Sequence, residues 1–453
     1  MEHFTVVDPR GSDREVARQM GYQMVDLIVD HLASLASQPV VSPRRLPEPP
    51  PPGGRPWPEL LALLQQQVVP GAMQVAHPRF FGHMDSGPLF VSVLADFLAA
   101  ALNQNMLHRE VSPLASEMEE AVVQWLCRRA DLEPEAGGTL VSGGFAANLT
   151  GVLLARQRTP ERRLLLGSEQ AHYSLAKIAR LLGLEFEMLP VDDGFRLDPI
   201  ALARRLKQLR EPPLAVIATA GTTSTGSVDP LPEIALLCEQ HGVWLHVDAA
   251  HGGGALFSLS ARSRLVGIEQ ANSITIDPHK WLMQPKSMGA VLVQEPARLQ
   301  ETFSTAAPYL GKAGPVSLGQ LTLQGTRRFD ALRLWAAWQH LGDTGLASLV
   351  DRSLALTQYL ADAVARHPEF EAACAPELNL FCFRLKGEDE KTEAARHRLV
   401  ERGAGYLSLT TLQGRRWLRA VMLNPSTTPA DVDAVLAALL AEEPQGPAGA
   451  PSK

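Results

Sequence analysis

Several features are scarce in this chain of 453 residues. Its four cysteines lie far apart and form no CxxC pair, so we expect reduced thiols and a cytoplasmic protein rather than a disulfide framework or a zinc site. No apolar run is long enough to cross a bilayer, and the first residues have neither the basic nor the apolar region of a signal peptide. We therefore expect no membrane association.

Basic residues are outnumbered by acidic ones. The 42 Lys and Arg residues against 49 Asp and Glu residues give a net charge of −7, and no basic stripe is present, which argues against a nucleic-acid partner. The Walker A motif and the GxGxxG fingerprint are absent, which disfavours an unrelated nucleotide-binding α/β protein. No carboxylates or cysteines stand at metal-ligand spacing, so we expect no metal.

The length of the chain predicts several structural units, because it exceeds what one hydrophobic core supports. Apolar residues at helical spacing between 13 and 37 predict an amphipathic helix capped by Asp13, and a proline-rich segment follows it. We interpret residues 1–60 as a helix and arm that wrap a second subunit. We expect a large domain at 61–330, a smaller α+β domain at 331–441 and a disordered tail at 442–453.

Between 163 and 300, short apolar strands alternate with helices, which is typical of a mostly parallel sheet flanked by helices. Ligands of such sheets bind at the carboxyl ends of the strands. The expected strands are 163–166, 185–188, 215–218, 244–247, 273–276 and 290–293.

Polar residues follow several of these strands. A glycine turn at 142–148 stands between a strand and a helix, where it could hold a phosphate or be only a tight turn. Asp248 ends an apolar strand and needs a cationic partner, unless it merely caps the next turn. Lys280 follows another strand; most lysines lie on the surface, but a desolvated one can act as an amine nucleophile.

One ligand accounts for these features together. Pyridoxal phosphate has a phosphate for the glycine turn, an aldehyde for Lys280 and a pyridine nitrogen for Asp248. His172 could then stack on the face of the ring, although a lone histidine is more often a surface or capping residue.

At these residues the sequence resembles the group II pyridoxal-phosphate-dependent amino-acid decarboxylases, which include aromatic-L-amino-acid, glutamate and diaminobutyrate decarboxylases. The resemblance runs from about Gly21 to Leu440. It implies an α/β fold of the aspartate-aminotransferase type and an intertwined homodimer. The motifs that carry it are HVDAAHGG at 246–253 and DPHKW at 277–281, supported by HPRFFG, SEQAHYS, ATAGTT and LNPSTT.

The resemblance also implies roles for single residues. Lys280 would bind the cofactor aldehyde, Asp248 would pair with the ring nitrogen and His172 would stack on the ring. The other cofactor contacts would be Thr223, Ala250, Asp277 and His279, with Gly143, Gly144, Phe145 and Asn148 in the phosphate turn, and the substrate contacts would be Phe80, His83, Ser86 and Arg419.

The implied activity is decarboxylation of a small L-amino acid to its amine and carbon dioxide. Gln284-Pro285 and the segment 326–332 are similar to diaminobutyrate decarboxylases, whereas DPHKW and HPRFF suit the aromatic branch equally well. The sequence therefore leaves the substrate open between the two. Asp85 and Glu110 are candidates to receive a distal amine.

Three departures from the family pattern affect this expectation. Phe145 stands where relatives often have a hydroxyl residue, and Asp277 replaces an asparagine found in some of them. The stretch from 310 to 325 has no tyrosine, although relatives carry one there that protonates the substrate carbon; Tyr309 lies at its start. Without a proton donor, oxidative deamination to an aldehyde would compete. A catalytically silent binding homologue is the other alternative, which the intact Lys280 argues against.

Overall fold

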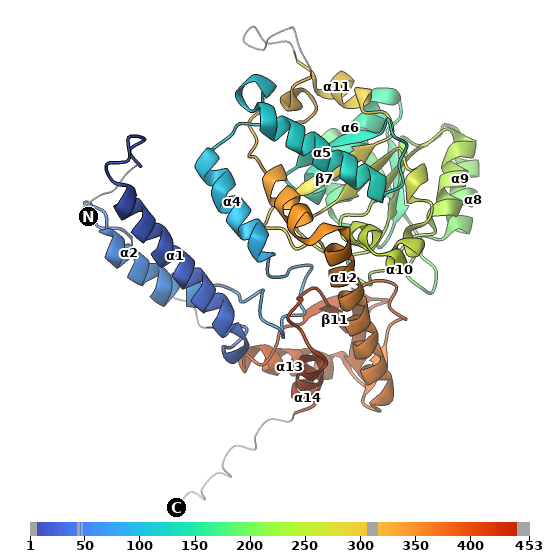
Figure 1. Cartoon of the computed structure of the whole chain (residues 1–453). Helices are drawn as coiled ribbons and strands as arrows, with labels where there is room; N and C mark the ends of the chain where they lie inside the picture. Colours follow the sequence, from blue (N-terminus) through green and yellow to red (C-terminus); the bar gives the residue numbers. More distant parts are fainter. Residues whose placement is uncertain (1–6, 43–45, 47–48, 306–315, 442–453) are drawn as a thin grey trace, which may run out of the picture.

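The computed structural model describes residues 7–42, 46, 49–305 and 316–441, and every structural statement below concerns these residues. An N-terminal pair of helices stands beside the main body, which consists of a larger domain built on one sheet and a smaller domain built on another (Figure 1). The expected tail at 442–453 lies outside the described residues. Within the described part of the chain, none of the helices combines the length and apolar composition that crossing a membrane requires.

The N-terminal arm consists of α1 (Arg14–Ser34) and α2 (Trp57–Leu63), held together by a hydrogen bond from the Trp57 indole to the Gln23 side chain at 2.7 Å. The expected amphipathic helix is thus confirmed. Asp13 precedes α1, but its carboxylate accepts the backbone N–H of Asp8 and makes no cap to the helix, contrary to the expectation. No residue of α1 is fully buried in the single chain, and apolar residues such as Met24 and Ile28 are only half-buried.

The large domain is organised around a 7-stranded sheet of order β1-β7-β6-β5-β4-β2-β3, and this confirms the predicted mostly parallel sheet. Only β7 runs against its neighbours β1 and β6, so the carboxyl ends of all the other strands meet at one edge. The strands are β1 (Gly137–Val141), β2 (Leu164–Ser168), β3 (Glu185–Leu189), β4 (Ala215–Thr219), β5 (Trp244–Asp248), β6 (Ser273–Ile276) and β7 (Gly289–Val293).

Alternating residues of the strands face opposite layers of helices. Ala215 and Ile217 of β4 join a core with α6 and α7, whereas Val216 and Ala218 join the larger core with α5 and α9. This sorting is what a strand buried on both faces requires, since successive side chains point to opposite sides. The helices of this domain are α4 (Phe90–Leu102), α5 (Pro113–Arg129), α6 (Gly144–Arg158), α7 (Ser174–Leu182), α8 (Pro199–Gln208), α9 (Leu231–His241), α10 (Leu259–Arg262) and α11 (Ala297–Phe303).

The long helix α12 (Ala331–Arg366) joins the two domains and is interrupted at Gly342, whose backbone is not helical. Before this point Trp338 stacks on Trp125 of α5 with ring centroids 4.7 Å apart, so the first part of α12 packs on the large domain. After it, Leu356 and Leu360 enter the core of the small domain. The boundary expected at 331 therefore precedes the point at which the helix changes domain.

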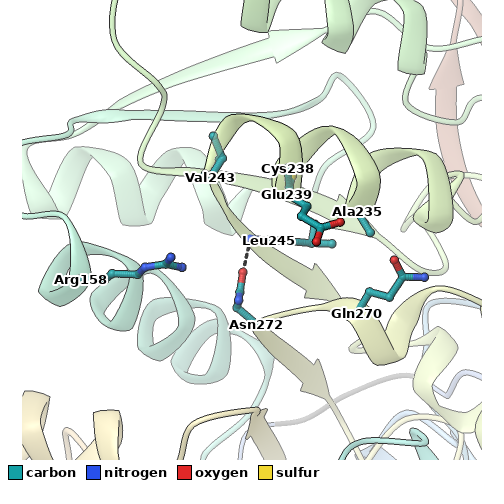
Figure 2. Close-up of a pocket in the computed structure, with 9 residues that line it drawn as sticks. Arg158, Ala235, Cys238, Glu239, Val243, Leu245, Gln270 and Asn272 are labelled. Atoms are coloured by element: carbon teal, nitrogen blue, oxygen red, sulfur yellow. Dashed lines mark hydrogen bonds between the residues drawn. The ribbon is translucent and has the colours of Figure 1, made fainter.

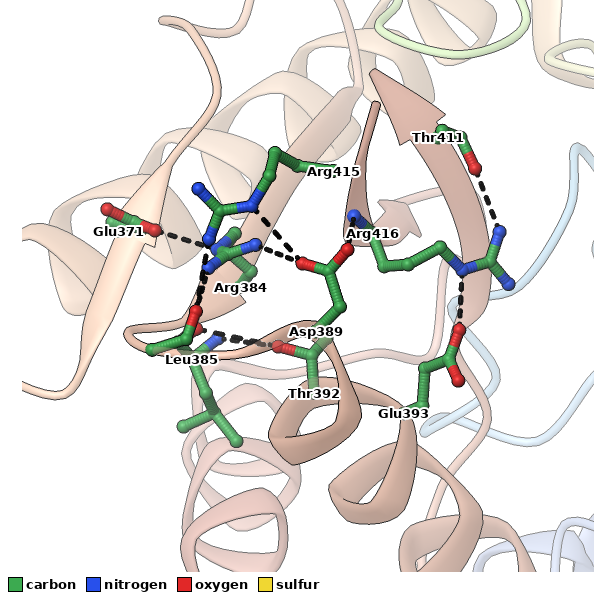
Figure 3. Close-up of polar contacts among 10 residues, drawn as sticks. Glu371, Arg384, Leu385, Asp389, Thr392, Glu393, Thr411, Arg415 and Arg416 are labelled. Atoms are coloured by element: carbon green, nitrogen blue, oxygen red, sulfur yellow. Dashed lines mark hydrogen bonds and ion pairs between the residues drawn. The ribbon is translucent and has the colours of Figure 1, made fainter. Parts of the chain in front are cut away.

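The small domain has a 4-stranded antiparallel sheet of order β10-β11-β9-β8, covered by α13 (Asp389–Glu401) and α14 (Pro429–Leu440). Asp389, the first residue of α13, accepts hydrogen bonds from the Arg384 and Arg415 side chains and from the Arg416 backbone (Figure 3). Arg384 is buried and also binds Glu371 at 2.7 Å, so its charge is compensated. The strands are β8 (Phe370–Ala372), β9 (Leu380–Leu385), β10 (Ser408–Leu412) and β11 (Arg415–Val421).

Candidate active site

The carboxyl ends of β1, β4, β5 and β6 surround one cavity of about 360 Å³. This is the size range of sites for small molecules and cofactors. The topology explains the convergence, because strands that run in the same direction end at the same edge of the sheet. The cavity is lined by Met84, Ser142, Gly143, Gly144, Phe145, Ala146, Asn148, His172, Thr219, Gly221, Thr223, Asp248, Ala250, His251, Asp277, His279, Lys280 and Ser287.

Lys280 lies in the turn that follows β6, with its ammonium 3.4 Å from the Asp277 carboxylate. Trp281 and Leu282 behind it are buried, which anchors the turn and leaves only 20% of the lysine side chain exposed. Burial raises the pKa of Asp277, although the nearby Lys280 ammonium opposes that effect. The ion pair with Asp277 therefore fixes the position of the Lys280 amine at the cavity.

Asp248 ends β5 as a buried carboxylate with a fixed set of donors. Its Oδ1 accepts the backbone N–H of Ala250 at 3.1 Å, and its Oδ2 accepts the side-chain amide of Asn148 at 2.8 Å. Asn148 was expected in the phosphate turn, but its side chain is directed to Asp248 from the first turns of α6. Within the described residues no cation is paired with Asp248, so its charge lacks a counter-ion.

His172 stands at the same cavity, just before α7, and its Nδ1 lies 2.7 Å from the hydroxyl oxygen of Ser174. Burial lowers the pKa of His172, and Asp248 opposes this effect in part. The imidazole is therefore neutral at pH 7, which suits a ring that stacks on another aromatic ring rather than one that attracts an anion.

The glycine turn at the start of α6 fits an anionic ligand, because Gly143 and Gly144 open a helix whose first N–H groups have no partner within the helix. A side chain would not be tolerated at Gly144, since a Cβ there would lie 2.8 Å from Asp277 Oδ2. Two buried oxygens of residues that line the cavity, Asp277 Oδ1 and Thr219 Oγ1, have no hydrogen-bond partner in the described chain. These features together fit pyridoxal phosphate. They are an amine, a carboxylate without a counter-ion, the N-terminus of a helix and two buried oxygens without hydrogen-bond partners.

Phe145 and His279 complete this side of the cavity. The Phe145 ring is 37% exposed and receives the Lys177 ammonium over its face at 5.2 Å. His279 is held by its Nδ1, which lies 2.5 Å from the carbonyl oxygen of Met288, while its Nε2 is 3.9 Å from Asp277. Ala250 and Thr223 also line the cavity, as expected for cofactor contacts.

The expected substrate residues lie in the loop at 77–89, but they are engaged with the small domain. Phe80 stacks on Tyr406 with centroids 5.1 Å apart, and His83 Nε2 is 3.3 Å from the Tyr406 hydroxyl. The Ser86 hydroxyl is buried without a partner. From this loop it is Met84 that lines the cavity in the single chain.

Arg419, the other expected substrate contact, is buried in β11 and does not line the cavity. Its Nε donates to the carbonyl oxygen of Thr223 at 2.5 Å, and its Nη1 donates to the Ser408 hydroxyl at 3.1 Å. Burial lowers the pKa of Arg419 to about 10. The arginine therefore ties the small domain to the Thr223 turn of the site. Tyr309, the remaining candidate, lies outside the described residues.

A second cavity opens at the amino ends of β5 and β6, on the opposite edge of the sheet (Figure 2). There Asn272 accepts the backbone N–H of Leu245 at 2.8 Å, and the thiol of Cys238 is buried. Burial raises the pKa of Cys238 to about 12, so this thiol is not a nucleophile at pH 7. None of the candidate catalytic residues is at this cavity.

Sequence reasoning missed several residues of the site. His246 is buried behind Asp248, His251 stacks on Trp281 with centroids 5.5 Å apart, and Tyr406 packs against the loop at 77–89. The motif at 246–253 includes both histidines, and the alternation of β5 places His246 and Asp248 on the same side of the strand. That signal could have identified His246.

Comparisons with known proteins agree with this geometry. The model of the pyridoxal-dependent decarboxylase conserved domain matches residues 39–386. The aromatic-L-amino-acid decarboxylase of Bacillus atrophaeus is 32% identical over 444 residues, which cover 91% of this chain and 92% of that protein. The L-2,4-diaminobutyrate decarboxylase of Rhizobium meliloti (strain 1021) is 34% identical over 456 residues, covering 94% of this chain and 91% of that protein.

Solved structures give the same result. The crystal structure of Oryza sativa TDC with PLP and tryptamine has a TM-score of 0.89 at 26% identity and covers 97% of this chain and 98% of that chain. Mouse CSAD has a TM-score of 0.87 at 28% identity, covering 94% and 98%. The chain therefore belongs to the family of pyridoxal-dependent decarboxylases and is a PLP-dependent amino-acid decarboxylase.

Proposed function

We propose that the cavity at the carboxyl ends of the strands binds pyridoxal phosphate and converts an aromatic L-amino acid to its amine and carbon dioxide. The observation that carries the proposal is the placement of Lys280 and Asp248 at one cavity that also contains the N-terminus of α6. When bound, pyridoxal phosphate supplies an electron sink for the electron pair that the departing carboxyl group leaves behind.

Lys280 is the residue that attaches the cofactor in this proposal. The Asp277 carboxylate 3.4 Å away would hold the amine of Lys280 at the place where the cofactor aldehyde has to approach it. His279, 3.9 Å from the same carboxylate, limits where Asp277 can turn.

Asp248 holds the ring nitrogen in its protonated form, because a buried carboxylate without a counter-ion favours a cation beside it. Neutral His172 would stack on the cofactor ring, and Thr223 and Ala250, which line the same cavity, would contact the rest of the cofactor. Gly143, Gly144 and Phe145, at the start of α6, would supply backbone N–H groups to the phosphate. Tyr309 stays the first candidate for the residue that returns a proton to the substrate carbon.

We infer an aromatic rather than a diamino-acid substrate from the residues that could receive the distal group. From the loop at 77–89 the cavity is lined by the apolar Met84. Asp85, a candidate to receive a distal amine, already forms an ion pair with Lys286. Glu110, the other candidate, has a side chain that is 85% exposed. Relatives in the comparisons include enzymes named for aromatic, diamino and acidic amino acids, so diamino acids are the alternative to test.

We further infer that the enzyme works as a homodimer. The helix α4 exposes Phe97 and Leu98 to 65% and 51%, and α1 buries no residue within its own chain. Contiguous exposed apolar surface of this kind is typical of a subunit interface.

The assignment of Lys280 is tested by borohydride reduction of the holoenzyme, followed by peptide mapping of the labelled lysine. We expect the label on Lys280, and we expect Lys280→Ala to lose both the label and turnover. Lys391→Ala, on the surface of α13, is the matched control and should keep both. A label on another lysine, or near wild-type turnover in Lys280→Ala, would contradict the proposal.

The reaction itself is tested with a panel of aromatic, diamino and acidic L-amino acids, in air and under argon. We expect amine and carbon dioxide in equal amounts, highest with an aromatic substrate. Aldehyde and peroxide that form only in air would instead establish the oxidative branch. Highest turnover with 2,4-diaminobutyrate would contradict the aromatic assignment.

A further inference from the structure

Behind Asp248 a line of side chains crosses the interior of the large domain. The Trp244 indole nitrogen is 3.0 Å from the Ser273 hydroxyl, which is 2.8 Å from Nδ1 of His246. Nε2 of His246 is 3.0 Å from Oδ1 of Asn148, whose amide nitrogen is 2.8 Å from Asp248 Oδ2. The line therefore connects two strands and a helix to the candidate partner of the cofactor nitrogen.

All the polar groups in this line are buried, so no water competes for them. His246 and Ser273 are fully buried, and Asn148 is 1% exposed. The helix α6 makes room for the imidazole at Gly151, where a Cβ would lie 2.3 Å from His246 Nδ1. Any larger residue at 151 would displace the histidine, so the local sequence of α6 accommodates this arrangement.

The Asp248 end fixes the direction of the hydrogen bonds as far as His246. At the other end the Trp244 indole can only donate, so the Ser273 oxygen accepts from it. That oxygen has a second lone pair, so the bond between Ser273 and His246 Nδ1 takes its direction from the protonation of the imidazole. An ionised Asp248 can only accept, so Asn148 donates its N–H and presents its oxygen to His246. His246 must then donate from Nε2. The reverse direction would require a protonated Asp248.

We propose that Asn148 and His246 are positioning residues that hold the Asp248 carboxylate aimed at the cofactor nitrogen through this series of hydrogen bonds, an inference that rests on the proposed role of Asp248. The chain delivers a fixed N–H to Asp248 Oδ2, and the Ala250 backbone delivers another to Oδ1. Donors that cannot accept favour the charged carboxylate over the neutral acid.

The state of His246 agrees with this arrangement. Burial lowers the pKa of His246 to about 4, against a smaller opposing effect of Asp248, so the ring is neutral at pH 7. A neutral imidazole has one donor nitrogen and one acceptor nitrogen, as the chain requires at this position. A charged imidazolium would donate from both nitrogens, and Ser273 would then accept from Nδ1 instead of donating to it.

The direction of the hydrogen bonds between Trp244 and Asp248 is tested by nitrogen-15 NMR of the apoenzyme with labelled histidine, which needs neither cofactor nor activity. The spectrum of His246→Gln identifies the signals of His246. At pH 7 we expect a proton on Nε2 and none on Nδ1. A proton on Nδ1, or on both nitrogens, overturns the proposal whatever the outcome of the Lys280 mapping.

The effect on Asp248 is tested by binding of pyridoxal phosphate labelled with nitrogen-15 in the ring. In His246→Leu and Asn148→Leu we expect the Kd for the cofactor to rise about tenfold, roughly 1.4 kcal/mol, with the ring nitrogen signal shifted toward the unprotonated form. His246→Gln keeps a donor and should stay within about threefold of wild type. Thr150→Val is the matched control, because the Thr150 hydroxyl is buried in the same helix as Asn148 but donates to the Ala146 carbonyl at 2.8 Å.

Folding of each variant is checked by circular dichroism. If His246→Leu and Asn148→Leu do not fold, Ser273→Ala is used in their place. This variant removes the donor to Nδ1 but leaves the imidazole in place, and we expect a smaller shift in the same direction. Wild-type cofactor affinity and an unshifted ring nitrogen in a folded His246→Leu or Ser273→Ala protein would overturn the proposal.

Discussion

At the scale of single residues, His251 makes the folding stability of the protein depend on pH in a predictable way. Its ring is buried against Trp281, and its Nε2 is 2.7 Å from the Asn379 side-chain oxygen. Burial lowers the pKa of His251 to about 3, and the Lys280 ammonium acts in the same direction. Because the unfolded chain has the ordinary value near 6.5, it binds the proton first as the pH falls, and the folded state loses stability below that pH.

The prediction concerns the difference between wild type and His251→Gln, which keeps an N–H for Asn379. Between pH 6.5 and 5, the free energy of unfolding of wild type should fall by about 1.6 kcal/mol more in total than that of the variant, with the slope difference approaching about 1.4 kcal/mol per pH unit at the lower end. Denaturant titrations at fixed protein concentration measure both slopes. His340→Gln, at an exposed position of α12, is the control and should follow wild type. Equal slopes for wild type and His251→Gln would contradict the prediction.

Some residues of the site could be predicted from the sequence, whereas the contacts of others could not. Lys280, Asp248 and the glycine turn could be found because each directly follows a strand, and the ends of parallel strands meet. Asn148 and Arg419 could be named as members of the site but not placed. The partner of Asn148 is 100 positions away and that of Arg419 is 196 positions away, so the contacts depend on how the elements pack.

At the scale of elements, the sheet strands of the large domain could be predicted to within a residue or two, because strands buried on both faces are continuous apolar runs. The small domain was harder to predict. β8 has only 3 residues, and β10 reads Ser-Leu-Thr-Thr-Leu, with partly exposed residues in the middle. Their pairing with β9 and β11 supplies the structure that the local sequence does not specify.

A buried ion pair connects several of these elements. Glu119 of α5 is fully buried and accepts from Arg327 at 2.8 Å, from the Leu140 backbone at 3.1 Å and from the Thr139 hydroxyl at 3.2 Å. The pair thereby holds α5, β1 and the segment before α12 together. Arg327 in turn is 8% exposed, so neither charge can be hydrated if the other is removed.

Arg327→Met should therefore lower the free energy of unfolding by about 3–5 kcal/mol, because it leaves Glu119 charged and buried without a cation. Glu119→Leu combined with Arg327→Met should recover only part of that loss. It removes the buried charge, but the Leu140 backbone and the Thr139 hydroxyl lose their acceptor. A double-mutant cycle by denaturant unfolding measures the coupling. A loss below about 1 kcal/mol in the single variant would show that the pair is not a structural connection.

At the scale of the whole molecule, the described chain leaves one side without a partner. Figure 1 shows α1 and α2 standing beside the body, with α4 at the edge of the large domain that faces them. On α4 the exposed apolar residues recur at helical spacing, which makes one continuous stripe. The stripe consists of Phe90, Leu94, Phe97, Leu98 and Leu102. A second copy of the chain would cover this stripe and the unburied face of α1 at once.

The last prediction tests that arrangement with light scattering coupled to gel filtration. The wild-type enzyme should have twice the 49.1 kDa mass of the chain, and Leu94→Asp combined with Phe97→Asp should have the mass of a single chain. Two carboxylates in the stripe would have to be buried without partners in the dimer, which costs more than the apolar contacts return. Ile200→Asp, at a residue 69% exposed on α8, is the matched control and should remain dimeric. A wild-type enzyme at the mass of one chain would contradict the dimer. A double variant at twice that mass would show that the subunit contact lies elsewhere.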